Sequence, residues 1–145
     1  MMIRNAECVF CRIVAAELPS SVVYEDESLI AFLDTSPLAE GHLLVLPRDH
    51  YAALTDMPPD LCGRICSALP AIARSVVAVT GAEGFNLLQS NGSVAGQVVN
   101  HVHFHLIPRA TADGLGFRWK TNTYAAGRAQ QLASEIQRAL AHPGA

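Results

Sequence analysis

The sequence predicts an α+β domain, with a mainly antiparallel sheet of five strands and two or three helices. The chain has 145 residues, a length that fits one domain with its own buried core, so we expect a single domain over residues 1–145. Half of the residues are hydrophobic and only 16% are charged, a composition that excludes an intrinsically disordered chain. The predicted strands and helices do not alternate one by one, which disfavours a parallel sheet of βαβ units.

The first half of the chain predicts a short helix followed by three strands. An amphipathic pattern over residues 8–16 predicts the helix, and Pro19 lies just beyond its end. Apolar runs bounded by turn residues predict strands over residues 22–25, 29–33 and 42–46. Residues 34–41 contain Ser36-Pro37 and are expected to form a loop.

The second half predicts a long helix, two strands and a last helix. The long helix is expected to begin near Pro59, because proline is tolerated in a first turn, and to end near Gly81. Pro70 lies inside this pattern and is expected to kink or split the helix. Further strands are predicted over residues 85–89 and 101–107. Apolar residues at helical spacing predict a helix over about 125–141, within a C-terminal extension of the domain core (about 8–109) that covers about 110–145.

Charge and hydropathy exclude several classes of protein. The formal net charge is -3 and the sequence pI is about 6.0, which disfavours bulk binding to nucleic acid or to an anionic membrane. Every apolar stretch of about 18 residues is interrupted by a charge, a proline or a polar cluster, so we expect no membrane span. Residues 1–7 are too short and polar for a signal peptide, and we expect a cytoplasmic protein.

The four cysteines form two close pairs, which is a poor framework for stapling distant segments. A close pair in a cytoplasmic protein more often binds a metal or takes part in catalysis. Cys62 and Cys66 are four residues apart in the predicted long helix and are expected to pack in the core. Cys8 and Cys11 form a C-x-x-C pair, a spacing that indicates a metal site.

Three histidines fall within five residues, in the segment H-V-H-F-H-L at positions 101–106. Side chains alternate across a strand, so His101, His103 and His105 are expected on one face, with the apolar residues between them towards the core. Two interpretations stay open from the residues alone. The imidazoles bind a metal ion, or one of them attacks phosphorus while its neighbours stabilise the charge on the phosphate oxygens.

Further motifs accompany these histidines. Gly96-Gln97 and Asn91-Gly92 precede them, and residues 41–50 read G-H-L-L-V-L-P-R-D-H. The N-terminal half contains C-V-F-C at 8–11, Y-E-D at 24–26 and A-F-L-D at 31–34. Over about residues 8–109 the chain resembles the histidine-triad (HIT) superfamily of nucleotide hydrolases and transferases, in particular its bacterial members with a C-x-x-C pair.

The resemblance implies a HIT-like fold and a hydrolase or transferase that acts on a purine nucleotide. It would cleave a P–N or P–O bond at the α-phosphate, in a nucleoside phosphoramidate or a dinucleoside polyphosphate, through a nucleotidyl-histidine intermediate. The resemblance makes His103 the nucleophile. It also implies that His105 and His42 contact the α-phosphate oxygens, and that Asn91 and Gln97 orient the phosphate or the nucleophile.

The same resemblance implies a nucleoside site, a metal site and a partner. Asp34 matches the residue that accepts hydrogen bonds from the ribose, and the base would lie among Phe10, Phe32 and Leu33, with Ile13 nearby. A structural zinc ion would be held by Cys8, Cys11, His50 and His101. Members of the family are normally homodimers whose sheets join across the interface, and we expect the same of this chain.

One position departs from the family pattern. Many relatives have Ser or Thr directly after the Gly-Gln pair, where a hydroxyl can reach the leaving group, but this chain has Val98. Because valine donates no hydrogen bond, activation of the leaving group would be weaker or rest on other groups, which leaves the substrate preference open. Arg118, Trp119 and Lys120 could shape the leaving-group side, but a solvated or core-packing role is favoured for them. Val98 also keeps an alternative open, a non-enzymatic nucleotide-binding module that zinc stabilises.

Overall fold

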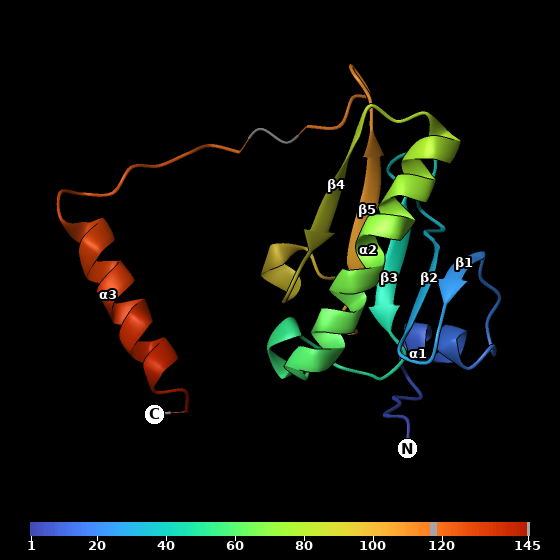
Figure 1. Ribbon diagram of the computed structural model, residues 1–145, viewed down its shortest axis with the longest axis horizontal. Helices are drawn as coiled ribbons and strands as arrows, with labels where there is room; N and C mark the ends of the chain where they lie inside the picture. The colour runs from blue at the N-terminus through green and yellow to red at the C-terminus, as the bar shows by residue number, and fades with distance from the viewer. Residues whose placement is uncertain (117–118, 145) are drawn as a thin grey trace. The chain divides into compact units, whose positions relative to one another are not determined.

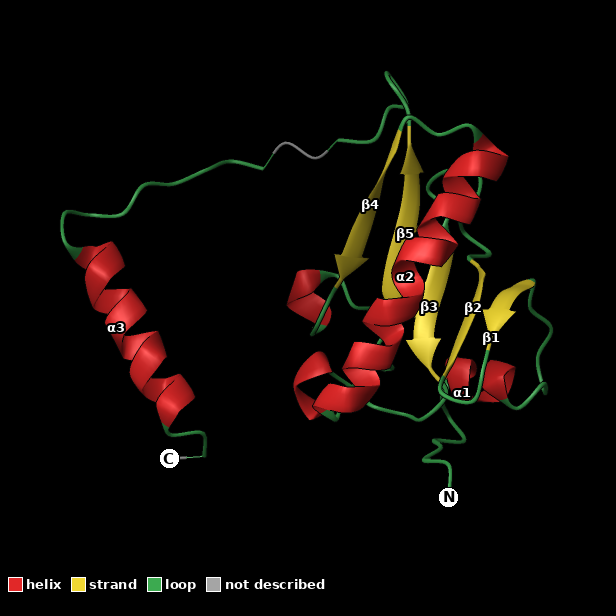
Figure 2. Cartoon of the chain, in the orientation of Figure 1, coloured by secondary structure: helices red, strands yellow, loops and turns green. Residues whose placement is uncertain are grey.

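The computed structural model describes residues 1–116 and 119–144, which fall into two compact units, Met1–Leu115 and Gly116–Ala145. The first unit contains a five-stranded sheet and two α-helices (Figure 1). In chain order its elements are α1 (Val9–Val14), β1 (Val22–Glu25), β2 (Leu29–Leu33), β3 (Leu43–Pro47), α2 (Pro59–Thr80), β4 (Gly84–Gln89) and β5 (Phe104–Arg109), with 3-10 turns at Leu54–Asp56 and Ser93–Ala95 (Figure 2). The predicted α+β fold is confirmed.

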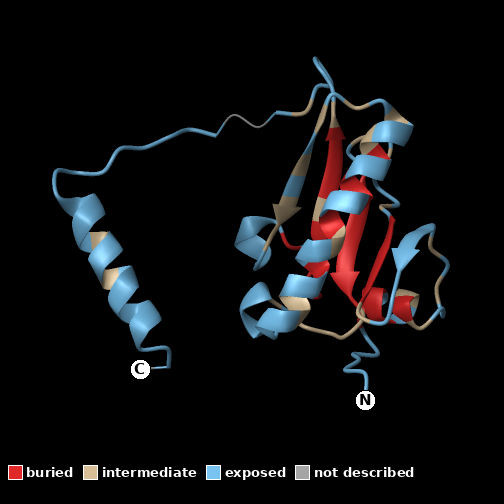
Figure 3. Ribbon diagram, viewed as in Figure 1, coloured by how far each residue is buried: buried red, intermediate tan, exposed pale blue. Residues whose placement is uncertain are grey.

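The strands form one antiparallel sheet in the order β1-β2-β3-β5-β4. The pairing of β2 with β3 is regular, with Ile30 opposite Leu46 and Phe32 opposite Leu44. The chain passes from β3 through α2 to β4 at the edge of the sheet. It then returns as β5, which lies between β4 and the central strand β3. Figure 3 shows that β3 and β5 are buried, whereas the edge strands β1 and β4 are more exposed.

Alternation along the strands divides the apolar residues between two layers. One face of β2, β3 and β5 packs against α2 in a cluster that includes Leu29, Val45 and Leu106. The opposite face packs against α1, where Phe10 and Phe32 belong to a second cluster. Burial of both faces explains why β2 and β3 are near-continuous apolar runs in the sequence.

The long helix α2 is continuous across Pro70, contrary to the expected split. Pro70 is exposed, so the carbonyl that loses its helical hydrogen bond faces the solvent side. Leu69 and Ile72 on either side of it are buried in the core cluster, so both halves of the helix pack against the sheet. The expected core packing of the cysteine pair is also only partial, because Cys62 contacts the core but Cys66 is exposed.

Among the described helices, α2 alone has the length and mean hydropathy of a candidate membrane span, with a mean of 1.4 over its most apolar window. A helix that lines the core of a globular domain meets the same two criteria. In this chain α2 carries Arg64, Pro70 and Arg74, and it buries Ile65, Leu69, Ile72, Ala73 and Val76 against the sheet. These contacts are those of an amphipathic helix that packs one face against the sheet.

The last strand begins three residues later than predicted, at Phe104. Before it, the amide of Val102 donates to the carbonyl of Tyr51, and the ring of His101 bonds to the carbonyl of Pro47. These contacts replace strand pairing. The predicted alternation still holds, since Val102, Phe104 and Leu106 lie in the α2 cluster and the histidines point to the other side.

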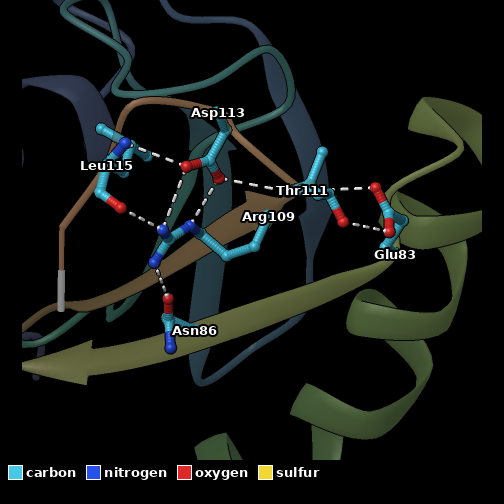
Figure 4. Close-up of polar contacts among 7 residues, drawn as sticks. Glu83, Asn86, Arg109, Thr111, Asp113 and Leu115 are labelled. Carbon is cyan, nitrogen blue, oxygen red and sulfur yellow. Dashed lines mark hydrogen bonds and ion pairs between the residues drawn. The ribbon is translucent and has the colours of Figure 1, made fainter.

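A polar cluster ties down the segment that follows β5 (Figure 4). Both carboxylate oxygens of Asp113 accept hydrogen bonds from Arg109, at 2.7 and 3.1 Å, which lowers the pKa of that carboxyl. Arg109 also donates to Asn86 on β4, at 2.7 Å. No motif in the sequence indicates this cluster, because its members are ordinary polar residues in and around turns.

The second unit contains α3 (Arg128–Ala141), close to the predicted helix. None of its residues is buried, and Ile136 and Leu140 on its apolar side are exposed. Arg128 and Glu135 form an ion pair at 3.4 Å along the helix.

Candidate active site and metal centre

Two cysteines and two histidines from three segments converge beside α1. The ligand atoms of Cys8, Cys11, His50 and His101 all lie within 4.8 Å of one another. Cys8 Sγ is 3.5 Å from His101 Nδ1, and Cys11 Sγ is 3.4 Å from His50 Nδ1. The sequence-predicted metal residues are therefore all brought together, and the group could hold a metal ion.

The hydrogen bonds of His101 suit a metal ligand. Its Nε2–H donates to the carbonyl of Pro47 at 2.8 Å, so Nδ1 carries the lone pair and faces the two sulfur atoms. Burial lowers the pKa of His101 to about 4, which keeps the ring neutral. Burial also raises the pKa of Cys11, so a bound cation is what would make this thiol a thiolate.

A cavity of about 400 Å³ lies next to this cluster, on the α1 side of the sheet. Of the residues that the sequence assigns to a nucleotide, it brings together Phe10, Phe32, Leu33, Asp34, His103 and His105. The other lining residues are Val9, Ile13, Pro19, Ser20, Thr35, Ser36, Leu44, Gly96, Val98 and Val99. The lining thus combines apolar side chains, including two phenylalanines, with two imidazoles and a carboxylate.

His103 has one ring nitrogen fixed and the other available. Its Nδ1–H donates to the carbonyl of His101 at 2.6 Å, so the lone pair is on Nε2. The side chain is 5% exposed, and the ring of Phe10 packs edge-on against it with centroids 5.1 Å apart. These contacts hold the imidazole in one orientation at the wall of the cavity.

His42 lies behind His105 and does not line the cavity. Gly41, which precedes it, has a φ of +86°, and an added Cβ would lie 2.6 Å from Thr80. Glycine therefore lets the loop approach the end of α2 and delivers His42 to the start of β3. The amide of Leu38 donates to His42 Nδ1 at 3.0 Å, so the ring proton is on Nε2, which donates to His105 Nδ1 at 2.9 Å.

This chain of hydrogen bonds sets the role of His105. Because its Nδ1 accepts from His42, the neutral ring of His105 carries its proton on Nε2, as a donor. Burial, with smaller effects from His103 and His42, lowers the pKa of His105 to about 4, and burial also lowers the pKa of His42. Asp34 Oδ2 is 3.7 Å from His42 Nε2, and the negative charge of this carboxylate partly offsets the lowering of the pKa of His42 and of His105.

Asp34, His42 and His105 also lie close enough together to hold a metal ion. The proton on His42 Nε2 lies between the two rings, however, so this group forms a hydrogen-bond chain.

Gln97 and Asn91 are placed away from the cavity. The Gln97 amide donates to the carbonyls of Ala52 and Val99, and its oxygen accepts from the amide of Gly92. Asn91 accepts from the amide of Leu54 at 2.7 Å. In this structure both side chains fasten the loop before the triad to the segment that follows β3.

Several lining residues escaped the sequence analysis. Thr35 and Ser36 follow Asp34 directly, and this adjacency could have indicated them.

Among the residues considered for the leaving-group side, Val98 lines the cavity and is 91% exposed. Trp119 and Lys120 are exposed, and Arg118 lies outside the described residues.

Comparison with known proteins gives a consistent picture. The family model described as HIT domain matches residues 15–112. An adenylylsulfatase of Arabidopsis thaliana is 45% identical over 109 residues, which are 75% of this chain and 55% of the relative; this chain thus spans about half the length of that relative. An adenosine 5′-monophosphoramidase of Candida albicans is 36% identical over 145 residues, 97% of this chain and 95% of the relative.

Solved structures agree with the fold. A HIT family member from Bacillus subtilis is 40% identical, with a TM-score of 0.87 over 91% of this chain and 96% of that one. A zinc-bound histidine triad family protein from Mycobacterium smegmatis is 36% identical, with a TM-score of 0.72 over 92% of this chain and 97% of that one.

Proposed function

The chain belongs to the HIT domain family, and from that premise we propose that it is a nucleotide hydrolase acting at the α-phosphate of a purine nucleotide. The scissile bond is a P–N or P–O bond. Relatives named adenosine 5′-monophosphoramidase and adenylylsulfatase support this class of substrate. The observation that carries the proposal is His103, whose Nδ1–H is held by a carbonyl while Nε2 keeps its lone pair at the cavity wall.

The reaction takes two steps. In the first, His103 Nε2 donates its lone pair to phosphorus, and the leaving group departs with the electron pair of the broken bond and takes up a proton. In the second, water attacks phosphorus, the His–P bond breaks with its pair returning to Nε2, and the proton of water is released. The net change is the addition of one water molecule. His105, neutral and carrying Nε2–H, donates to a phosphate oxygen as charge develops there.

The nucleoside packs against the apolar side chains of the cavity. Phe10 and Phe32, whose centroids are 5.7 Å apart, receive the base, and Leu33 adds apolar surface. Asp34 accepts hydrogen bonds from the ribose hydroxyls. This is possible because the amide of Ser36 uses only one acceptor position of the carboxylate, at Oδ1. Gln97 and Asn91 act by holding the loop before the triad.

Zinc is the metal that the donor set fits best. Two thiolates and two imidazoles make a closed tetrahedral shell, the kind found in structural zinc sites. Such a site would fix α1 against the segment that carries His101, and so would hold the cavity wall in place. The zinc-bound relative supports this assignment.

A homodimer and a cytoplasmic location complete the proposal. The exposed side chains of Phe85 and Leu87 on the edge strand β4 border an apolar groove with Cys66, Leu69, Pro70 and Ala73 of α2 and with Leu106. An edge strand with apolar neighbours suits pairing with a second copy, which would join the two sheets. The cytoplasmic location stays a prediction from the sequence.

The alternative is a nucleotide-binding module without turnover, favoured by Val98 at the position where relatives have a hydroxyl. One assay separates the two. The purified protein is incubated with adenosine 5′-phosphoramidate, adenylyl sulfate and a diadenosine polyphosphate, and AMP is measured, with the folded His103→Ala variant as the control. Release of AMP by the wild type alone supports the hydrolase. Binding of all three compounds without release supports the module.

A further inference from the structure

Next to the nucleotide cavity lies a second depression of about 360 Å³, which we call the outer depression. It is lined by Asn5, Glu7, Cys8, Val9, His50, Val98, Val99 and Asn100. Three of these residues, Val9, Val98 and Val99, also line the nucleotide cavity. The two depressions therefore share an apolar wall, which we call the valine saddle. The leaving group of a substrate bound in the cavity can extend over this wall into the outer depression.

The valine saddle is accessible. Val98 is 91% exposed and Val9 is 40% exposed, so their methyl groups face the groove. An apolar group lying on them loses contact with water, which favours carbon chains over charged groups at this point. No hydroxyl is offered by the three saddle residues.

The charges around the two depressions have one sign. Among the described residues that line them, the acidic side chains are Asp34 and Glu7, and none is Lys or Arg. Glu7 is exposed, and its carboxylate has no ion-pair partner in the described part of the chain. A leaving group with several negative charges would meet no Lys or Arg side chain there, whereas a positive end would meet the carboxylate of Glu7.

Resting on the proposed function, we propose that the outer depression is a subsite for the leaving group. Its ligand is the amine of a nucleoside phosphoramidate, with apolar carbons next to the P–N bond on the valine saddle and a cationic end beside Glu7. When His103 displaces it, the amine leaves with the electron pair of the P–N bond and gains a proton. The amide side chains of Asn5 and Asn100 can accept hydrogen bonds from its cationic end.

Three adenosine 5′-phosphoramidates of equal chain length test the subsite. They are made from butylamine, 1,4-diaminobutane and 4-aminobutanoic acid, so each has four carbons and ends in an apolar, a cationic or an anionic group. We expect kcat/KM to be about two- to fivefold higher for the diamine than for butylamine, as for an exposed ion pair, and lower for the aminobutanoate. In Glu7→Gln the ratio of diamine to butylamine falls to about one. Glu17→Gln, a change at an exposed carboxylate that pairs with Arg12 outside both depressions, keeps the wild-type ratio.

A second variant tests the saddle. Val98→Thr keeps the shape of the side chain but replaces a methyl group with a hydroxyl, so it lowers the preference for the butylamine compound over the unsubstituted phosphoramidate about three- to tenfold. Each ratio compares kcat/KM for two substrates of the same variant, so a smaller fraction of folded protein does not change the ratio. Equal kcat/KM for the butylamine, diamine and aminobutanoate compounds, or an unchanged ratio in Glu7→Gln, overturns the subsite while the hydrolase stands. Failure to release AMP from any of the compounds overturns the proposed function itself.

Discussion

His42 Nε2 donates to His105 Nδ1 over 2.9 Å, so a ring at the start of β3 sets which nitrogen of the third triad histidine carries the proton. The amide of Leu38 fixes the donor in turn, by occupying His42 Nδ1. The chain ends with Nε2–H of His105 as a donor beside His103, where the phosphate oxygens of a bound nucleotide would lie. His42 thus acts through His105, as a positioning residue.

Removing the donor at position 42 should slow turnover without removing the nucleophile. In His42→Ala, His105 loses the bond that fixes its tautomer, and we expect kcat/KM to fall about tenfold, the value of one hydrogen bond. In His42→Gln, an amide N–H can take the place of Nε2–H, so most of the loss is recovered. Equal losses in the two variants, measured by AMP release, would show that the donor has no such role.

One zinc ion per chain is expected, with Zn–S distances of about 2.3 Å and Zn–N distances of about 2.0–2.1 Å. Cys11→Ser should lose the metal and lower Tm by at least about 5 °C, because the site joins α1 to the segment before β5. The rate per folded molecule should change much less. Elemental analysis and thermal unfolding measure these effects, with Cys66→Ser as the control that keeps the zinc. Metal-free protein after growth with adequate zinc would count against the site.

Stability should fall on acidification between pH 6.5 and 4. The pKa of His105 is lowered from 6.5 to about 4, so in this window the unfolded chain binds a proton that the folded chain does not. Each such group decreases the free energy of unfolding by at most about 1.4 kcal/mol per pH unit as the pH falls. His105→Gln removes one group and should give a shallower slope in denaturant unfolding at several pH values. The exposed His142→Gln serves as the control, and equal slopes for His105→Gln and wild type would contradict the assignment.

The proposed dimer should depend on one edge of the sheet. Leu87→Lys places a charge on the exposed face of β4 beside the apolar groove, and light scattering should then report a monomer. Val22→Lys makes the same kind of change on the opposite edge strand, β1, and should leave the dimer intact. A dimer that survives Leu87→Lys but not Val22→Lys would move the interface to the other edge.

The sequence predicted most of the fold because the periodic patterns are strong. The apolar runs at β1 and β2 have the predicted bounds, and the C-x-x-C pair meets His50 and His101 as expected. The predicted start of β5 was wrong because the backbone amide of Val102 donates to the carbonyl of Tyr51 in a loop. No local sequence pattern indicates this contact. The continuity of α2 across Pro70 likewise depends on tertiary packing.

The site was predicted in its residue types more fully than in its contacts. Motifs identified Gln97, Asn91 and His42, but not their protein partners, which are Ala52 for Gln97, Leu54 for Asn91 and His105 for His42. Those bonds come from segments far apart in the sequence, such as Ala52 for Gln97, so no local pattern reveals them. The outer depression is likewise visible only once Glu7 and Val98 are brought together by folding.

Trapping the covalent intermediate tests the central claim most directly. The enzyme is mixed with an adenosine phosphoramidate labelled at the α-phosphate, the reaction is quenched within one turnover, and the labelled peptide is mapped. We expect the label on His103 and none in His103→Ala, whereas His105→Ala still forms the adduct at a rate lower by about 10²–10³, the effect of losing one donor to the developing charge. Label on His105 or His42, or full turnover by folded His103→Ala, would contradict the account.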